Sequence, residues 1–191
     1  MEFTAKQQKI IDVSISLIAE KGIQNLTIKN IAQAIGTSEP AVYRHFENKF
    51  DIIMCILESF DFDANSVLSN KTSTGALENI RTFLFDRYKR CSDKPNIAKV
   101  LFSEEYFQND ELLSKKILNI MHNHKGQIDA IILEGQKTGE IRRDIDPKSI
   151  FRIIFGSARL LIKQWALSNY SFNLLEEGSM LWEAQSKILT K

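Results

Sequence analysis

The sequence predicts an all-α protein with about nine helices, in which a small N-terminal domain of three helices precedes a larger helical domain. Apolar residues recur at intervals of three and four along most of the chain, and no segment alternates apolar and polar residues as a strand would. Only 3 Pro and 8 Gly interrupt the 191 residues, so long helices are allowed. We expect the two domains to span residues 1–47 and 48–191.

The first helix is predicted at residues 4–21. Thr4 can cap its free amide groups, and Gly22 can end it because glycine accepts backbone angles that other residues avoid. The predicted buried face consists of Ile10, Ile11, Ser14, Leu17 and Ile18. We expect this helix to support the two helices that follow it.

Two short helices separated by a tight turn follow. Thr27 can cap the first, whose apolar face consists of Ile28, Ile31, Ala32 and Ile35. Gly36 suits the turn, and Pro40 suits the first turn of the second helix, where no amide hydrogen is needed. This is the spacing of a helix-turn-helix unit.

The second of these helices, at residues 41–46, is predicted to have two different faces. Val42 and Phe46 face inward and fix the helix, which leaves a polar and aromatic outer face. Such a face suits the major groove of DNA, where base edges and phosphates both accept hydrogen bonds. The spacing alone also fits an ordinary helical hairpin with an exposed polar side.

The segment from Thr27 to Lys49 resembles the DNA-binding domain of the TetR family of transcriptional regulators. It reads T-I-x-x-I-A-x-A-I-G-T-S-x-x-A-V-Y-R-H-F-x-N-K and matches the family pattern without a gap. The resemblance is specific over about residues 4–56 and only architectural beyond them. It implies a ligand-responsive regulator, most often a repressor, which binds a palindromic double-stranded DNA operator as a homodimer and is released by a small-molecule effector.

The resemblance and the helix geometry together assign roles in DNA binding. Phosphate contacts are expected from Thr27, Thr37, Ser38, Tyr43, His45 and Lys49. Base contacts are expected from Lys29, Glu39, Pro40, Ala41 and Arg44. Glu39 could accept from the amino group of a cytosine, and Lys29 or Arg44 could donate to a guanine. Within residues 1–50, six basic side chains (Lys6, Lys9, Lys21, Lys29, Arg44, Lys49) face five acidic ones (Glu2, Asp12, Glu20, Glu39, Glu47). Binding must therefore depend on placed contacts rather than on bulk charge.

Six further helices are predicted at residues 48–68, 76–91, 96–107, 111–137, 147–169 and 174–189. Asn48 and Asp51 resemble a capping box at the start of the first of these, and Asp146 can cap the helix that Pro147 opens. The helix at residues 48–68 is apolar on more than one face, so we expect it to connect the two domains.

The segment 150–167 is apolar on nearly every side, so this helix must be buried over most of its surface. Part of that burial could come from a second subunit, and the resemblance implies that the last two helices form a four-helix dimer interface. The predicted interface residues are Ile154, Ala158, Leu161, Trp165, Leu175, Gly178, Leu181 and Trp182. The alternative is a core within one chain.

The larger domain is predicted to hold a small apolar or aromatic effector. The candidate contacts are Phe60, Phe83, Tyr88, Phe102, Tyr106, Phe107, Met121, His122 and Trp165. Aromatic residues at helical spacing also fit an ordinary core. A carboxylate on the effector is left open by the sequence.

The chain is predicted not to be an enzyme and to carry no cofactor or metal. His122 and His124 are two residues apart and cannot share a metal on one helix face. The sequence has no CxxC, Gly-rich phosphate loop or nucleophile elbow. Cys55 and Cys91 are predicted to be reduced packing residues, with a disulfide or redox pair as the alternative.

The expected location is the cytoplasm. The N-terminus MEFTAKQQK does not resemble a signal peptide, and no run approaches the ~18 apolar residues of a membrane span. A rival function is a helical small-molecule carrier or sensor whose head no longer binds DNA, which the nearly neutral charge of the head supports.

Overall fold

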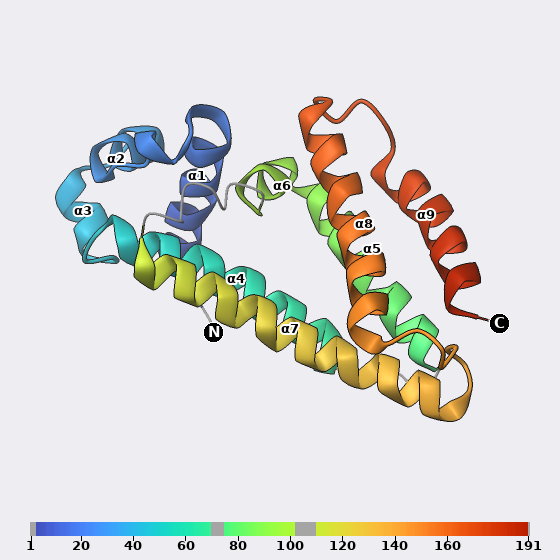
Figure 1. The fold of residues 1–191 in the computed structure, drawn as a ribbon. Helices are drawn as coiled ribbons and strands as arrows, with labels where there is room; N and C mark the ends of the chain where they lie inside the picture. Colours follow the sequence, from blue (N-terminus) through green and yellow to red (C-terminus); the bar gives the residue numbers. More distant parts are fainter. Residues whose placement is uncertain (1–2, 70–74, 102–109, 191) are drawn as a thin grey trace. The chain divides into compact units, whose positions relative to one another are not determined.

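The computed structural model describes residues 3–69, 75–101 and 110–190, and every regular element within these ranges is helical (Figure 1). The elements are α1 (Ala5–Lys21), the 3₁₀ turn η1 (Ile23–Asn25), α2 (Ile28–Ile35), α3 (Glu39–Tyr43), α4 (Lys49–Ser69), α5 (Ala76–Asp93), α6 (Pro95–Leu101), α7 (Glu111–Thr138), α8 (Pro147–Leu167) and α9 (Leu174–Leu189). The predicted all-α class is confirmed. The predicted helix at residues 96–107 is seen as α6, and residues 102–107 lie outside the described part.

The chain forms two compact units, each built from two segments. Met1–Asp63 and Lys99–Ile117 form the first unit, and Ala64–Ala98 and Leu118–Lys191 form the second. The helices α4 and α7 each contribute residues to both units. The domain limits at residues 1–47 and 48–191 divide the chain along its sequence and stay a prediction.

The N-terminal head, α1 to α3, encloses a small apolar core. Thr4 and Gln7 form a capping box: Thr4 Oγ1 accepts from the Gln7 amide at 3.3 Å, and Gln7 Oε1 accepts from the Thr4 amide at 3.0 Å. The predicted buried face of α1 is confirmed, including Ser14, whose hydroxyl donates to the carbonyl of Ile10 at 2.7 Å. The rest of this core includes Leu26, Ile28, Ile31, Ala32, Val42 and Phe46.

The turn between α2 and α3 has the predicted chemistry. Thr27 Oγ1 accepts from the Asn30 amide at 3.1 Å and so caps α2. Gly36 ends α2 with φ 76° and ψ 42°, the left-handed region in which glycine is not strained. A side chain with a Cβ would meet no atom within 4 Å there, so the backbone angle is what favours glycine at this position.

The helix α3 begins and ends earlier than the sequence predicts. It covers Glu39–Tyr43 instead of residues 41–46. The carbonyl of Val42 accepts from the amides of His45 at 2.9 Å and Phe46 at 3.2 Å, so a tight turn replaces the last helical turn. Phe46 is nevertheless buried as predicted.

A cap and an ion pair hold α4 within the first unit. Asn48 Oδ1 accepts from the Asp51 amide at 3.0 Å, as predicted, but Asp51 Oδ2 accepts in return from the amide of Glu47 at 3.1 Å and not from that of Asn48. Further along α4, Glu58 pairs with Lys116 of α7 at 2.9 Å. The first unit therefore joins the head to the start of α7.

In the second unit, α9 packs against both α5 and α8 (Figure 1). Tyr88 of α5 is fully buried, and its ring lies against Gly178 of α9 so closely that a Cβ added there would be 2.6 Å from two ring carbons. Gln185 of α9 is also buried and donates to the carbonyl of Ile154 at 2.9 Å and to Ser157 Oγ at 2.8 Å. These contacts fix the inner faces of α5, α8 and α9.

The loop between α7 and α8 forms hydrogen bonds with free backbone groups at the ends of α5 and α9. The Glu140 carboxylate accepts from the amides of Ala76 at 2.6 Å and Leu77 at 3.0 Å, and so caps α5, whose preceding residue Gly75 has no side chain to do so. The Arg142 amide donates to the carbonyl of Leu189 at 2.8 Å, at the end of α9.

Asp146 caps α8 as predicted. Its Oδ1 accepts from the Ser149 amide at 3.0 Å, and hydrogen bonds from the side chain and amide of Ser149 lower the pKa of the Asp146 carboxyl. The side chain of Asn173 caps α9 in the same way by accepting from the amides of Leu175 and Glu176.

Candidate DNA-binding surface and effector site

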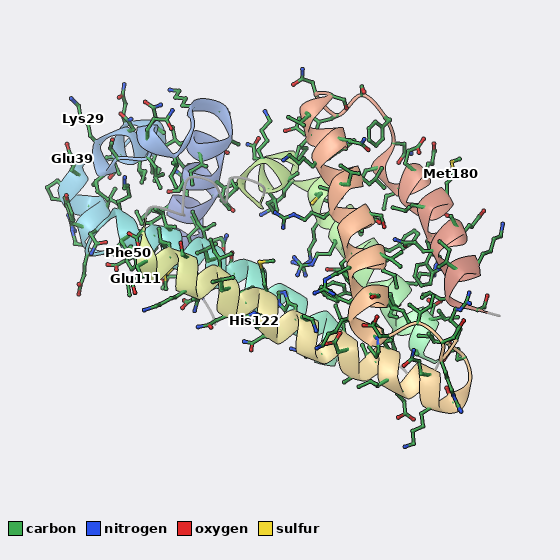
Figure 2. The ribbon with its side chains drawn as sticks, viewed as in Figure 1. Lys29, Glu39, Phe50, Glu111, His122 and Met180 are labelled. Atoms are coloured by element: carbon green, nitrogen blue, oxygen red, sulfur yellow. The ribbon has the colours of Figure 1, made fainter. Side chains whose placement is uncertain are left out.

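The predicted DNA contacts lie on the surface of the head. Thr27, Lys29, Thr37, Ser38, Glu39, Pro40, Tyr43, Arg44 and Lys49 are exposed, and Ala41 and His45 are half-buried. Figure 2 shows Lys29 and Glu39 reaching outward from the region of α2 and α3. No residue of the predicted set is buried in the core of the head.

Two features make this surface suitable for recognition by placed contacts. Tyr43 is the last residue of α3, and its aromatic side chain is 51% exposed although its neighbour Val42 is fully buried. Tyrosine is common at interfaces because it combines an apolar ring with a hydroxyl that can form a hydrogen bond. Thr27 already accepts a hydrogen bond from the Asn30 amide, but a hydroxyl that accepts can still donate, for example to a phosphate.

The predicted effector contacts are not gathered in one place. Phe83, Tyr88 and Trp165 are buried in the second unit, whereas Met121 and His122 are exposed on α7. Figure 2 labels His122 on this helix. Phe102, Tyr106, Phe107 and the side chain of Phe60 lie outside the described residues. The five described members of the set therefore do not share one environment in the second unit.

The buried members of this set have different surroundings. Trp165 Nε1 donates to the carbonyl of Phe172 at 2.9 Å, and its ring packs on Tyr170 at 4.7 Å between centroids. The Tyr88 hydroxyl is excluded from solvent and has no hydrogen-bond partner among the described residues, and burial raises the pKa of Tyr88 to about 12. Neither side chain is part of the aromatic contacts that Phe83 makes.

Phe83 belongs to a cluster of three phenyl rings. Its ring lies 5.7 Å from that of Phe155 in an edge-to-face arrangement, and Phe155 stacks on Phe151 at 4.7 Å. Such pairs stabilise each other beyond the area that they bury. Phe151 and Phe155 are one helical turn apart on α8, so their spacing could have placed them together, but the sequence alone did not connect them to Phe83.

Charged and polar side chains border these rings. The Arg87 guanidinium lies over the Phe83 ring at 5.0 Å, and the Lys125 ammonium lies over the Phe151 ring at 5.6 Å. The ring of His124 is 6.4 Å from that of Phe83. Lys125 also pairs with Asp129, one turn along α7.

We call this set the aromatic–basic cluster; it consists of Phe83, Arg87, His124, Lys125, Asp129, Phe151 and Phe155. Three apolar rings and two basic side chains from α5, α7 and α8 meet here, within the second unit. The sequence prediction included only Phe83. The basic members were missed because their spacing to the rings depends on how α7 and α8 pack against α5.

Most of the predicted dimer contacts are already covered within one chain. Ile154, Ala158, Trp165, Gly178 and Trp182 are buried, Leu161 and Leu181 are half-buried, and only Leu175 is exposed. The exposed apolar side chains of the same two helices are Ile153, Leu160 and Leu167 of α8, and Leu175, Met180 and Ile188 of α9. Figure 2 shows Met180 on the outer side of α9.

Sequence reasoning could not choose between the two sides of α8, because both are apolar. The exposed positions 153, 156, 160 and 167 lie on one stripe of α8, and Gly156 leaves open space there. We call the six exposed side chains together with Gly156 the outer apolar face of α8 and α9.

Other kinds of site find no support in the described part of the chain. No group of three or more His, Cys, Asp or Glu residues there could hold a metal ion. Both cysteines are free; Cys55 is half-buried, and burial raises the pKa of Cys91 to about 11. No described helix combines the length and the apolar character needed to cross a membrane.

Two family models match the chain in succession. The model for bacterial regulatory proteins of the tetR family matches residues 10–53, and the model for the C-terminal region of YsiA-like protein matches residues 64–184. The first match covers most of the head, and the second covers more than half of the chain.

Curated proteins match over most of their length. The fatty acid metabolism regulator protein of Bacillus subtilis (strain 168) is 24% identical over 180 residues, which cover 93% of this chain and 92% of that protein. The HTH-type transcriptional repressor KstR2 of Rhodococcus jostii (strain RHA1) is 24% identical over 168 residues, covering 84% of this chain and 79% of the repressor.

Solved structures share the fold. The fatty acid degradation regulator FadR of Bacillus halodurans superimposes with a TM-score of 0.82 at 20% identity and 97% coverage of each chain. FadR of Bacillus subtilis in complex with stearoyl-CoA gives a TM-score of 0.79 at 22% identity, with 95% of this chain and 98% of that chain covered.

Proposed function

The chain belongs to the tetR family of bacterial regulatory proteins, and from this premise we propose that it is a repressor released from its operator by a long-chain fatty acyl thioester of coenzyme A. As a member of this family it is a DNA-binding transcriptional regulator that responds to a ligand and acts as a homodimer. We propose that it acts in the bacterial cytoplasm, where operator DNA is found.

The aromatic–basic cluster is the observation that carries the proposed effector class. Its three phenyl rings offer an apolar surface for a hydrocarbon chain, and the Arg87 guanidinium lies over one of these rings. A fatty acyl thioester of coenzyme A has both parts: a long apolar chain and several phosphate charges, which a guanidinium group binds well. Two similar proteins point the same way, one named for fatty acid metabolism and one solved with stearoyl-CoA.

Operator binding in the presence and absence of stearoyl-CoA tests this proposal. We expect the affinity for the promoter upstream of the chain's own gene to fall about 100-fold at saturating ligand, which requires a preference of about 2.7 kcal/mol between the two states of the protein. Coenzyme A without the acyl chain is the control and should leave the affinity unchanged. Equal operator affinity with and without stearoyl-CoA would rule out this effector class.

The head is proposed to read DNA through α3, with two heads of a dimer meeting successive major grooves about 34 Å apart. We propose that Tyr43 binds a phosphate through its hydroxyl and that Glu39 contacts a base, because both are exposed on α3. An effector that favours a different tilt of α4, the helix that leaves the head, would change the separation of the two heads and so weaken binding.

Substitutions in α3 should separate the two kinds of contact. Tyr43→Phe removes one hydrogen bond to the DNA backbone and should weaken every operator sequence alike, by about fivefold, since such a bond contributes about 1 kcal/mol. Glu39→Ala should instead change the preferred base at one position of each half-site, by about 1–3 kcal/mol of discrimination. Titration of both variants against a panel of single-base operator variants measures this, and identical profiles would contradict the assigned roles.

The dimer is proposed to form through the outer apolar face of α8 and α9. Exposed apolar side chains on two adjacent helices suit an interaction surface, and a second copy of the chain would bring the same residues to a twofold axis. Gly156 would let the two copies of α8 approach closely. Of the eight interface residues that the sequence predicts, this face includes Leu175, and the other seven lie outside it.

A further inference from the structure

Asp129 is the one acidic member of the aromatic–basic cluster. Its Oδ2 accepts from the Lys125 ammonium, which in turn lies over the Phe151 ring. Its other oxygen, Oδ1, is excluded from solvent and has no hydrogen-bond donor among the described residues. A buried carboxylate oxygen without a donor is unfavourable in the free protein and is therefore a place where a bound ligand can supply the missing donor.

Burial distinguishes this ion pair from the ordinary ones on the helix surfaces. Lys89 and Asp93 on α5 have the same spacing, and their side chains are 69% and 60% exposed. Lys125 and Asp129 are only 29% and 21% exposed. Ion pairs on the surface contribute little to stability. A pair held beside apolar rings, where water is largely excluded, strongly affects which charged groups of a ligand can bind next to it.

The carboxylate also determines what the neighbouring cation can bind. Lys125 would be an obvious partner for a free carboxylate lying against the phenyl rings, but Asp129 already neutralises it. A ligand carboxylate placed there would meet a like charge in surroundings that water screens poorly. A neutral thioester whose pantetheine arm carries amide and hydroxyl hydrogens meets no such repulsion, and one of these hydrogens can pair with Asp129 Oδ1.

We infer that Asp129 is a specificity-determining residue, which makes the site accept acyl thioesters and reject the corresponding free fatty acids. The inference rests on the proposed function, because it concerns the same effector site. Selectivity of this kind needs one interaction that disfavours the wrong ligand and another that favours the right one. Asp129 Oδ2 neutralises Lys125 and so disfavours a ligand carboxylate, whereas Oδ1 can accept a hydrogen bond from the thioester ligand.

The experiment compares the binding of stearoyl-CoA and stearate to the full-length dimer by equilibrium dialysis. The wild type should prefer stearoyl-CoA. Asp129→Asn keeps the shape and removes the charge, so it should raise the stearate affinity by about tenfold while lowering the stearoyl-CoA affinity. Asp129→Ala also removes the charge, and alanine is a good helix former, so α7 should still fold. This variant should raise the stearate affinity in the same way. Asp93→Asn, in the exposed pair of the same spacing, is the matched control and should change neither affinity.

The outcomes separate this inference from the proposed function. Binding of stearoyl-CoA by the wild type, with the same preference in both Asp129 variants, would overturn the role of Asp129 alone. An equal loss of both ligands in these variants would also overturn it, since this indicates only a damaged site. Binding of neither ligand by the wild type would overturn the proposed function, and this inference with it.

Discussion

Leu160→Glu should convert the dimer into monomers and reduce operator affinity by at least about 100-fold, because two linked heads bind a palindrome far more tightly than one. Leu160 is 56% exposed in the single chain and is central in the outer apolar face, between Ile153 and Leu167 on α8. A glutamate there costs a single chain little, but it would place two like charges near the twofold axis of the dimer. Analytical ultracentrifugation and operator titration measure the two effects.

Leu133→Glu is the matched control for this prediction. Leu133 is an apolar side chain on α7 that is 54% exposed, so the two substitutions change exposure and charge almost equally. The Leu133 variant should remain dimeric and bind the operator as the wild type does. A Leu160 variant that remains dimeric would show that the interface lies elsewhere. If both variants were monomeric, the added charge would be acting nonspecifically.

Gly178→Ala should destabilise the protein by about 1–3 kcal/mol, the usual cost of inserting atoms into a well-packed core. The added Cβ would lie 2.6 Å from Cδ2 and Cε2 of Tyr88, and this ring is fully buried and cannot move aside without displacing its neighbours. The close approach of α9 to α5 depends on the missing side chain. Urea unfolding at a fixed protein concentration measures the change.

Gly126→Ala is the paired control and should act in the opposite direction. A Cβ at position 126 of α7 meets no atom within 4 Å, so alanine only removes the flexibility of glycine from a helix interior. We expect stabilisation of about 0.4–1 kcal/mol. If both variants lost stability equally, contact with Tyr88 could not be the cause of the Gly178 effect.

Helix limits could be predicted from the sequence because they depend on local chemistry. The structure has the predicted helix caps at Thr4, Thr27, Asn48 and Asp146. Gly36 adopts the left-handed backbone angles that its position at the end of α2 predicts. The cap of α5 could not be predicted, because Glu140 reaches it from a loop more than sixty residues away.

The sides of the helices were harder to predict than their limits. A helix with a polar side has a defined inner face, as α1 does, whereas α8 is apolar on both sides and its pattern fits either orientation. The effector site was only partly predicted for a related reason. Arg87, Lys125 and Phe155 are far apart in sequence, and only the packing of three helices brings them near Phe83.

The helix α7 is a single element of 28 residues, about 42 Å long at 1.5 Å per residue, and it carries Lys116 as well as Lys125 and Asp129. Lys116 and its partner Glu58 belong to the first unit, whereas Lys125 and Asp129 belong to the second. The boundaries between the units fall inside α4, α6 and α7 and not in loops. Cutting the chain at any of these boundaries would interrupt a hydrogen-bonded helix, so neither unit is a separable stretch of the sequence.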